Sequence, residues 1–472
     1  MVSDLFRIQQ SNLPLGDPHI CSDSKNRLSL IGTIYEPLVN RTSPNGIEPC
    51  LATTWHIDAN ALTWDIRLRE HVVFHDGSDL TAGDVAANLE RIRDPKVGGA
   101  FGTQGVYASY IGGARFEVVN KGRLRIHLRE SMADLLELLA EMPIASEDAL
   151  DDLPKEHVGS GPYRLRDLDK DAIEMEAHSK HWRGKPAHRR LVWKSEPDEE
   201  ARVNAVASGD ADIASGVTLR GVQLADAKDV RVSRMYGSLC VIYMINCIIG
   251  TCKDRRVRQA LNFALDRKTI IDRIAGGAAE PLTGPLTPLH FGWDPETSGY
   301  PHDPAAARHL LADAGYPNGL TLKMDIPSEM PDEAIPLSKM MAEQYREAGI
   351  EMEVRIHRNR PAYADMVRAK QIGDLCCFDS SPLSTFRVLR EKIHSGIKGP
   401  WWEGYTNREV DALIEKAQRT VDQSERQRIY RTTYRMIRDD APWVFLYRPE
   451  SFWAVGRGTV WEPSWDGVVW IQ

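Results

Sequence analysis

The chain has 472 residues, enough for about two to four domains of ordinary size. Its 67 acidic and 59 basic residues give a net charge of -8, which argues against a nucleic-acid or anionic-membrane surface, because such a surface needs concentrated basic charge. The longest apolar stretches, such as Leu239–Ile245, have the length of strands and are too short to span a membrane.

No export signal is visible in the first residues, because Met1–Arg7 lacks a basic region followed by an apolar one. Either the chain begins after a leader has been removed, or the protein stays inside the cell as a cytoplasmic ligand sensor. Such a sensor usually carries a DNA-binding module, and we expect no room for one ahead of Asp17. We favour the first interpretation and expect a periplasmic or extracytoplasmic protein.

Seven cysteines stand at positions 21, 50, 240, 247, 252, 376 and 377, and this odd count leaves at least one thiol unpaired. No pair has the spacing of a zinc site or a redox motif. Cys247 and Cys252 could bridge across a short loop or remain two buried thiols. The adjacent Cys376 and Cys377 lie in an apolar run and are expected to pack as small hydrophobic side chains.

The first clear elements are a strand and a helix. Residues 63–68 alternate between apolar and polar side chains, which predicts a strand with one buried face. After a turn, Thr81 is expected to cap a helix, with Asp84 three residues on to complete the capping box. Asp94-Pro95 is expected to stop this helix.

The second half of the chain repeats the alternation of helices and strands. An apolar stripe from Val257 to Ile274 predicts one helix, which begins near Asp254 and ends at Gly276-Gly277. The elements expected after it are a helix at 303–315 capped by Asp303-Pro304, a strand at 320–324, a helix at 337–348 and a strand at 352–356. This alternation predicts an α/β fold with two open sheets covered by helices.

Two aromatic, β-rich segments, Leu239–Asn246 and Trp443–Tyr447, separate stretches that have the pattern of independent α/β units. We interpret them as crossings between two lobes, so the first lobe is expected to use both ends of the chain. The expected divisions are 1–237 for the first lobe with an inserted subdomain at about 38–165, 238–442 for the second lobe, and 443–472 for the return to the first.

A series of motifs then runs nearly from end to end of the chain, in a fixed order. They are Tyr35–Val39, Pro49–Trp55, Leu62–Arg69, Val73–Gly77 with Leu80–Val85, Gly159–Tyr163, Trp182–Pro186, Ser208–Asp212, Arg256–Leu261 and Leu310–Pro317. Through them the chain resembles the family 5 extracellular solute-binding proteins of ABC importers, a group of dipeptide, oligopeptide and nickel-chelate receptors. These motifs are mainly scaffold, so they identify the fold better than the ligand.

The resemblance implies a periplasmic-binding-protein-like fold of two lobes joined by a hinge. The ligand is expected in the cleft, where contacts to both lobes favour the closed form. The resemblance also implies a small-molecule or short-peptide ligand and, as partner, the membrane permease of an ABC importer. We expect a monomer that binds no nucleic acid and carries no cofactor.

The resemblance places one carboxylate in the ligand site. In peptide-binding relatives an aspartate followed by a short polar stretch and an aromatic residue pairs with the α-amine of the peptide. Here Asp379 takes that position and Phe386 is the aromatic residue, so Asp379, Ser380 and Ser381 are candidate ligand residues. The alternative is that Asp379 caps a helix near Ser384 or lies in a turn. The Ser-Ser-Pro sequence departs from the usual pattern, which puts a standard peptide ligand in question.

Further candidates come from aromatic and polar segments. Adjacent tryptophans in an extended segment cannot both face one core, so Trp401, Trp402 and Tyr405 are candidates, with packing on the lobe as the alternative. In the first lobe the candidates are His19, Ser22 and Tyr107 with its neighbour Tyr110, for which core packing is again the alternative. His394 lies near the aromatic segment and is the last candidate.

A nickel-chelate receptor of this family would carry an arginine near Glu141–Ala145, where this chain has Ile144 and Ala145. The fourteen histidines are scattered, and His178 and His181 fall in a stretch with the pattern of a surface. Neither these nor His71 and His75 form a ligand set with cysteines or carboxylates, so no metal site is predicted. A bound chelate stays open.

The sequence lacks the local signatures of common enzymes: the Gly-x-Ser-x-Gly elbow, His-Glu-x-x-His, the phosphate-binding Gly-x-x-x-x-Gly-Lys and the dinucleotide fingerprint. We therefore predict a binding protein without catalytic residues. Its expected ligand is a short peptide or an amino-acid-like compound, because Asp379 suits an amine. A sugar, an opine-like compound or a metal chelate remain alternatives.

Overall fold

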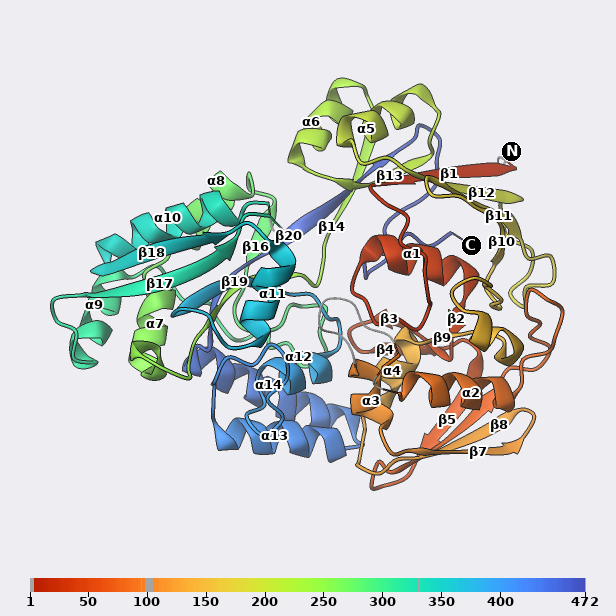
Figure 1. Ribbon diagram of the computed structural model, residues 1–472, viewed down its shortest axis with the longest axis horizontal. Coiled ribbons are helices and arrows are strands. Elements are labelled where there is room, and N and C mark those ends of the chain that lie inside the picture. Colours follow the sequence, from red (N-terminus) through yellow and green to blue (C-terminus); the bar gives the residue numbers. More distant parts are fainter. Residues whose placement is uncertain (1–3, 95, 98–104, 330–331, 472) are drawn as a thin grey trace. The chain divides into compact units, whose positions relative to one another are not determined.

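The computed structural model describes residues 4–94, 96–97, 105–329 and 332–471. The chain divides into two units, Met1–Met235 with Ser451–Gln472, and Tyr236–Glu450. The C-terminal segment returns to the first helix of the first unit (Figure 1). There the Val469 backbone N–H donates to Ser29 Oγ at 2.9 Å. The lobe boundaries and the inserted subdomain expected from the sequence stay predictions.

The first unit contains mostly short elements. Its strands are β1 (Leu5–Gln10), β2 (Glu36–Pro37), β3 (Val39–Ser43), β4 (Gly46–Pro49), β5 (Ala52–Ile57), β6 (Thr63–Leu68), β7 (Arg115–Asn120), β8 (Arg123–His127), β9 (Pro143–Ile144), β10 (Tyr163–Leu168), β11 (Ala172–Ala177), β12 (Arg190–Ser195), β13 (Ile213–Val217) and β14 (Arg231–Tyr236). Its helices are α1 (Lys25–Ile34), α2 (Ala82–Ile92), α3 (Val106–Ile111), α4 (Leu135–Glu141), α5 (Glu199–Ser208) and α6 (Leu219–Ala227), with a 3-10 helix at Glu147–Asp152.

The main sheet of the first unit has the strand order β10-β11-β12-β1-β13-β20, where β20 is Trp443–Val455. β1 lies parallel to both β12 and β13, while the outer strands are antiparallel. Three large aromatic side chains, Tyr35, Tyr163 and Trp193, are fully buried in its core. The parallel strands β12, β1 and β13 end at Ser195, Gln10 and Val217, so these residues share the carboxyl edge of the sheet.

A second, antiparallel sheet of the first unit has the order β5-β6-β8-β7. The predicted strand at 63–68 is confirmed as β6, and its apolar residues Trp64, Ile66 and Leu68 are buried. The predicted capping box is also confirmed, because Asp84 N donates to Thr81 Oγ1 at 3.4 Å while Thr81 N donates to Asp84 Oδ2 at 2.9 Å. The helix ends at Ile92, and the predicted stop at Pro95 lies outside the described residues.

The second unit alternates strands with longer helices. Its strands are β15 (Cys240–Ile245), β16 (Ala279–Pro281), β17 (Leu320–Pro327), β18 (Ile350–His357), β19 (Leu375–Ser380) and the first part of β20. Its helices are α7 (Arg255–Phe263), α8 (Arg267–Ile274), α9 (Pro304–Asp313), α10 (Ala334–Glu347), α11 (Arg360–Arg368), α12 (Thr385–Lys392), α13 (Arg408–Arg419) and α14 (Gln423–Asp440), with a 3-10 helix at Thr251–Lys253. The predicted elements at 303–315, 320–324, 337–348 and 352–356 correspond to α9, β17, α10 and β18.

The sheet of the second unit has the order β20-β15-β19-β17-β18, with β17 parallel to β18 and β19. Every residue of β15 is buried, because both faces of the sheet are covered. Val241, Tyr243 and Ile245 pack with residues of α7–α10, and the alternate residues of β15 pack with residues of α11–α14. The predicted α/β organisation, an open sheet with helices over both faces, is confirmed for this unit.

The prediction of one helix from Asp254 to Ile274 is wrong. The structure contains two helices, α7 and α8, and Asp266 caps the second by accepting from Thr269 N at 3.1 Å. Arg267 is buried at the corner and donates to the backbone oxygens of Asn262 and Phe445 at 2.9 and 2.6 Å. The apolar stripe continues through the break because both helices bury the same side. The periodicity of the sequence alone therefore cannot detect the break.

Cys376 and Cys377 are buried in β19 as small core residues, which confirms that prediction. Cys247 and Cys252 carry free thiols, so of the two alternatives the unbridged one holds. Burial raises the pKa of the Cys247 thiol to about 11, which keeps it protonated near neutral pH. Among the described residues, no helix combines the length and the apolar character that a membrane crossing requires.

Candidate ligand-binding residues

The segments that follow three parallel strands lie at the carboxyl edge of the second unit's sheet. The parallel strands β17, β18 and β19 end at Pro327, His357 and Ser380. In open α/β sheets, ligands bind outside the carboxyl ends of the parallel strands. Asp379, Ser380 and Ser381 therefore lie where a ligand of this unit would be expected.

Asp379 is part of a strand and caps no helix. It lies in β19 opposite Val241 of β15, and Lys392 Nζ of α12 donates to its backbone oxygen at 3.0 Å. The alternative interpretation as a helix cap is wrong, because Ser384 itself caps α12 by accepting from Arg387 N at 3.1 Å. No local sequence pattern points to Lys392, because only the fold brings the last residue of α12 back to the strand end.

Ser380 and Ser381 follow Asp379 but differ in their environment. Ser380 is 1% exposed, and its Oγ has no hydrogen-bond partner in the part of the chain that the structure describes. The backbone oxygen of Ser381 accepts from Ser238 Oγ at 2.9 Å, which fixes the strand end to the start of β15.

The aromatic candidates of the second unit pack largely within that unit. Trp401 is 6% exposed and its ring lies 4.5 Å from the ring of Phe378. Tyr405 is buried and its hydroxyl donates to Asp440 Oδ2 at 2.6 Å. Trp401 and Tyr405 therefore pack on the lobe, which was the alternative named for these residues. Trp402 is half-buried, and its Nε1 donates to the Tyr405 backbone oxygen at 2.7 Å.

One buried ion pair fastens this aromatic segment. Lys370 Nζ donates to the Pro400 backbone oxygen at 2.7 Å and to Glu403 Oε1 at 3.2 Å. Glu403 is 4% exposed, and its second oxygen is buried without a hydrogen-bond partner among the described residues. Burial raises the pKa of Glu403 to about 7, although the nearby positive charge of Lys370 acts to lower it.

Glu403→Gln is expected to remove a pH-dependent loss of stability. Because the folded-state pKa is raised, protonated Glu403 stabilises the fold below the ordinary glutamate pKa of 4.5, and this contribution is lost as the pH rises through about 7. The variant should therefore be more stable than the parent at pH 8, by about 2 kcal/mol, and the difference should fade toward pH 5. Chemical unfolding across this pH range measures it, with the exposed Glu353→Gln as control; a difference independent of pH would contradict the prediction.

His394 is buried. Its Nδ1 accepts from Gly396 N at 3.1 Å, and its Nε2 lies 3.4 Å from Glu415 Oε1 of α13. Through these contacts both ring nitrogens of His394 help to connect the end of α12 with α13. A ligand role for His394 stays a prediction.

In the first unit, His19 and Ser22 belong to the loop between β1 and α1, at the carboxyl edge of its sheet. Two arginines hold this loop. Arg27 donates to the backbone oxygens of Pro14, Leu15 and Asp17, and Arg91 of α2 pairs with the Asp17 carboxylate at 2.6 Å. The loop is therefore well anchored before any ligand arrives.

His19 is completely buried. Its Nδ1 lies 2.9 Å from Arg91 Nη1, and its Nε2 lies 3.1 Å from the Pro143 backbone oxygen. Burial lowers the pKa of His19 to about 4, so the ring is neutral, accepting from Arg91 and donating to Pro143. Ser22 is half-buried, and its Oγ accepts from Ser24 N at 3.2 Å.

Tyr107 and Tyr110 lie on α3, and their exposed fractions are only 5% and 6%. Both are therefore buried, as expected for core packing, the alternative named for them. Contact of His19, Ser22 or Tyr107 with a ligand stays a prediction.

The interpretation of His178 and His181 as surface residues is wrong, because both are buried. His181 Nε2 lies 3.3 Å from Glu36 Oε1, and the Glu36 carboxylate also accepts from Trp182 Nε1 at 2.8 Å and from Ser160 Oγ at 3.0 Å. These donors satisfy a buried carboxylate and tie β2 to the loop around Trp182. The sequence could not show this cluster, since 145 residues separate Glu36 from His181.

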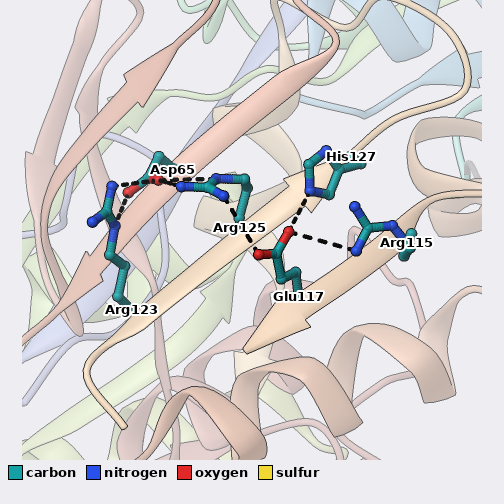
Figure 2. A network of polar contacts seen from close by, with 6 residues as sticks. All are labelled: Asp65, Arg115, Glu117, Arg123, Arg125 and His127. Atoms are coloured by element: carbon teal, nitrogen blue, oxygen red, sulfur yellow. Dashed lines mark hydrogen bonds and ion pairs between the residues drawn. The ribbon is translucent and has the colours of Figure 1, made fainter. Parts of the chain in front are cut away.

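A network of charges crosses the second sheet of the first unit. Figure 2 shows Asp65 of β6 between Arg123 and Arg125 of β8, and Glu117 of β7 in contact with Arg115, Arg125 and His127. Hydrogen bonds from Arg123 hold the pKa of Asp65 below its usual value. Each carboxylate is already held by several donors, so this network stabilises the sheet by cross-strand pairing and has no features of a ligand site.

The described residues contain no group of three histidine, cysteine or acidic side chains that could hold a metal ion. The charged clusters of the two units are built mainly from arginine–carboxylate pairs and hydrogen bonds to backbone oxygens. The carboxyl edge of the sheet in each unit therefore offers groups for hydrogen bonding and for the recognition of charge.

Comparisons with known proteins agree with this description. The family model for bacterial extracellular solute-binding proteins, family 5, matches residues 46–374. The chain is 28% identical to heme-binding protein A of Haemophilus influenzae over 456 residues, which cover 87% of this chain and 81% of that protein. It is 25% identical to the glutathione-binding protein GsiB of Escherichia coli over 453 residues, covering 92% of this chain and 87% of that one.

A solved structure of similar fold is the periplasmic binding protein DppA of Helicobacter pylori in complex with the peptide STSA. It has a TM-score of 0.79 and 23% identity, and the match covers 99% of this chain and 96% of that one. The predicted periplasmic-binding-protein-like α/β fold is thereby confirmed.

Proposed function

The chain belongs to the family 5 bacterial extracellular solute-binding proteins, and from this premise we propose that it captures a short peptide or an amino-acid-like solute for an ABC importer. It acts as a receptor outside the cytoplasm and delivers the solute to the membrane permease without changing it. In this mechanism a ligand that prefers the closed form of the protein shifts the population toward that form.

The likeness to a glutathione-binding protein over 92% of the chain is the observation that favours a peptide-like ligand most. Glutathione is a tripeptide with a free ammonium group and free carboxylates. Asp379 at the carboxyl edge of the second unit offers a carboxylate partner for such an ammonium group, through a charge-assisted hydrogen bond. Ser380 follows Asp379 in β19, and its buried Oγ has no hydrogen-bond partner among the described residues.

Calorimetric titration of the purified chain with glutathione and with trialanine tests the proposal, and native mass spectrometry of the unsupplemented protein searches for a co-purified ligand. We expect saturable binding of at least one of the two peptides, with recovery of the peptide unchanged. Glucose serves as the control ligand and is expected not to bind. Binding of neither peptide would contradict the proposal.

Heme is a second candidate, favoured by the 28% identity to a heme-binding protein. A shift of the heme absorption band on titration, saturating at one equivalent, would support it. A peptide that binds to the heme-loaded protein without displacing heme would separate the two activities.

A further inference from the structure

The loop 287–293 of the second unit contacts the turn between β19 and α12. His290 of this loop is 2% exposed, and its Nε2 lies 2.7 Å from the backbone oxygen of Pro382. In the other direction, Thr385 Oγ1 donates to the backbone oxygen of Phe291 at 2.6 Å. Hydrogen bonds from both sides therefore connect the loop with the turn.

The surroundings of His290 determine which of its ring nitrogens carries the hydrogen. The Thr287 backbone N–H donates to His290 Nδ1 at 3.0 Å, so Nδ1 is an acceptor and the hydrogen is on Nε2. Nε2 therefore donates to the backbone oxygen of Pro382. Because Pro382 is buried, its oxygen needs a donor from the protein, and the ring of His290 supplies one.

The loop 287–293 is in turn held by α14. The rings of Phe291 and Tyr430 meet edge to face, with their centroids 5.9 Å apart. Gly292 has a φ of +83°, and a Cβ built on it would lie 2.3 Å from Tyr430 Cβ, so only glycine fits at this position. His290 therefore reaches the turn from a loop whose own position is fixed by close packing.

The turn that His290 holds carries one of the candidate ligand residues. Ser381 directly precedes Pro382, and its backbone oxygen accepts from Ser238 Oγ at 2.9 Å. A residue before a proline is largely restricted to extended conformations, so fixing Pro382 also limits the conformations of Ser381. The hydrogen bond from His290 therefore helps to determine where the turn presents Ser381.

We propose that His290 is a positioning residue for ligand binding: through the backbone oxygen of Pro382 it holds the turn that carries Ser381 in the conformation that binds the ligand. This inference rests on the proposed function and adds to it a residue that prepares the turn before the ligand arrives. When only a fraction of the molecules has the binding conformation, the apparent affinity falls by that fraction. Loss of the hydrogen bond should therefore weaken binding although no ligand contact is removed.

The test compares His290→Leu with His290→Gln in the full chain. Leucine cannot donate to the Pro382 oxygen, so amide hydrogen exchange in residues 381–388 should become roughly 5- to 150-fold faster without ligand, while exchange in β17 and β18 stays as in the parent. In calorimetric titrations with glutathione and trialanine, the dissociation constant of whichever peptide the parent binds should rise by about fivefold or more. Glutamine carries an amide N–H near the position of Nε2, so His290→Gln should restore most of the affinity.

His302→Leu is the matched control, because it makes the same substitution at an exposed histidine twelve residues further on. It should change neither the exchange nor the affinity. If His290→Leu does not fold, His290→Asn replaces it, because the shorter amide does not reach Pro382 and should bind the peptide more weakly than His290→Gln does.

Three results would separate the possible failures. Peptide affinity like that of the parent in His290→Leu would overturn this inference and leave the proposed function intact. Equal losses of affinity in the glutamine variant and in the leucine or asparagine variant would also overturn it, because the effect would then not depend on the donor. Failure of the parent protein to bind either peptide would overturn the proposed function together with this inference.

Discussion

Replacing Arg267 by methionine is expected to lower the free energy of unfolding by about 3–5 kcal/mol, because its guanidinium serves several buried backbone oxygens at once. It donates to the backbone oxygens of Asn262, Leu265, Tyr300 and Phe445, and to Asn262 Oδ1. Methionine keeps the apolar stem but leaves these acceptors without their donor. Since burial already lowers the pKa of Arg267 to about 10, the site holds the cation through hydrogen bonds against a cost of desolvation.

The same corner also fixes the last strand of the second unit's sheet. Asn262 Nδ2 donates to the Trp443 backbone oxygen at 3.0 Å, and Phe445 N donates to Asn262 Oδ1 at 3.1 Å. Loss of Arg267 therefore affects both the junction of α7 with α8 and its attachment to β20. This double role explains why a single side chain is expected to have so large an effect.

Thermal and chemical unfolding of Arg267→Met measure the effect, with Lys268→Met as the adjacent control. The Lys268 side chain is 86% exposed and pairs with Asp272 at 2.6 Å, so its loss should change the stability very little. The unfolding temperature of Arg267→Met should fall by at least about 6 °C. If both variants unfold like the parent, the hydrogen bonds of Arg267 do not hold this corner together.

Replacing Asp379 by asparagine is expected to raise the dissociation constant of an ammonium-bearing ligand by about 10- to 150-fold, equivalent to about 1.5–3 kcal/mol. Asparagine keeps the shape of the side chain and one acceptor oxygen, so the change isolates the charge. The position in β19 is set by backbone pairing with β15, and this pairing does not depend on the carboxylate.

An N-acetylated ligand completes a double cycle. Acetylation removes the ammonium charge, so it should weaken binding to the parent protein by a factor close to that of the substitution, and it should have little further effect in Asp379→Asn. Asp365→Asn, at an exposed carboxylate of α11, is the control and should bind like the parent. Unchanged affinity of Asp379→Asn for the free amine would remove this residue from the ligand site.

Several features of the protein follow from the sequence because they depend on short-range interactions. The alternation at 63–68 places Trp64 and Ile66 on the buried face of β6. The hydroxyl of Thr81 and the carboxylate of Asp84 cap α2 within a single turn, and Asp303 caps α9 by accepting from Ala306 N at 2.8 Å. Caps and strand faces involve neighbours at most a few residues apart, so the order of residues is sufficient to predict them.

The membership of the family could also be predicted from the sequence, because its motifs are scaffold segments in a fixed order. The same motifs say little about the ligand. Of the candidate residues, Asp379 and Ser380 lie at the carboxyl edge of a sheet. Ser380, Trp401, Tyr405 and His394 are all buried. Aromatic and histidine residues serve cores and ligand sites equally well, so residue type alone could not distinguish these roles.

Only the tertiary structure decided which distant residues meet. The break between α7 and α8 depends on Arg267 reaching Phe445, 178 residues away, and the burial of His181 depends on Glu36. Arg360 and Lys392 reach the Phe378 ring from two different helices. Local preferences determine which elements form. The partners of a buried charge are determined by packing across the whole unit, because a missing hydrogen bond is costly only where packing has removed the charge from water.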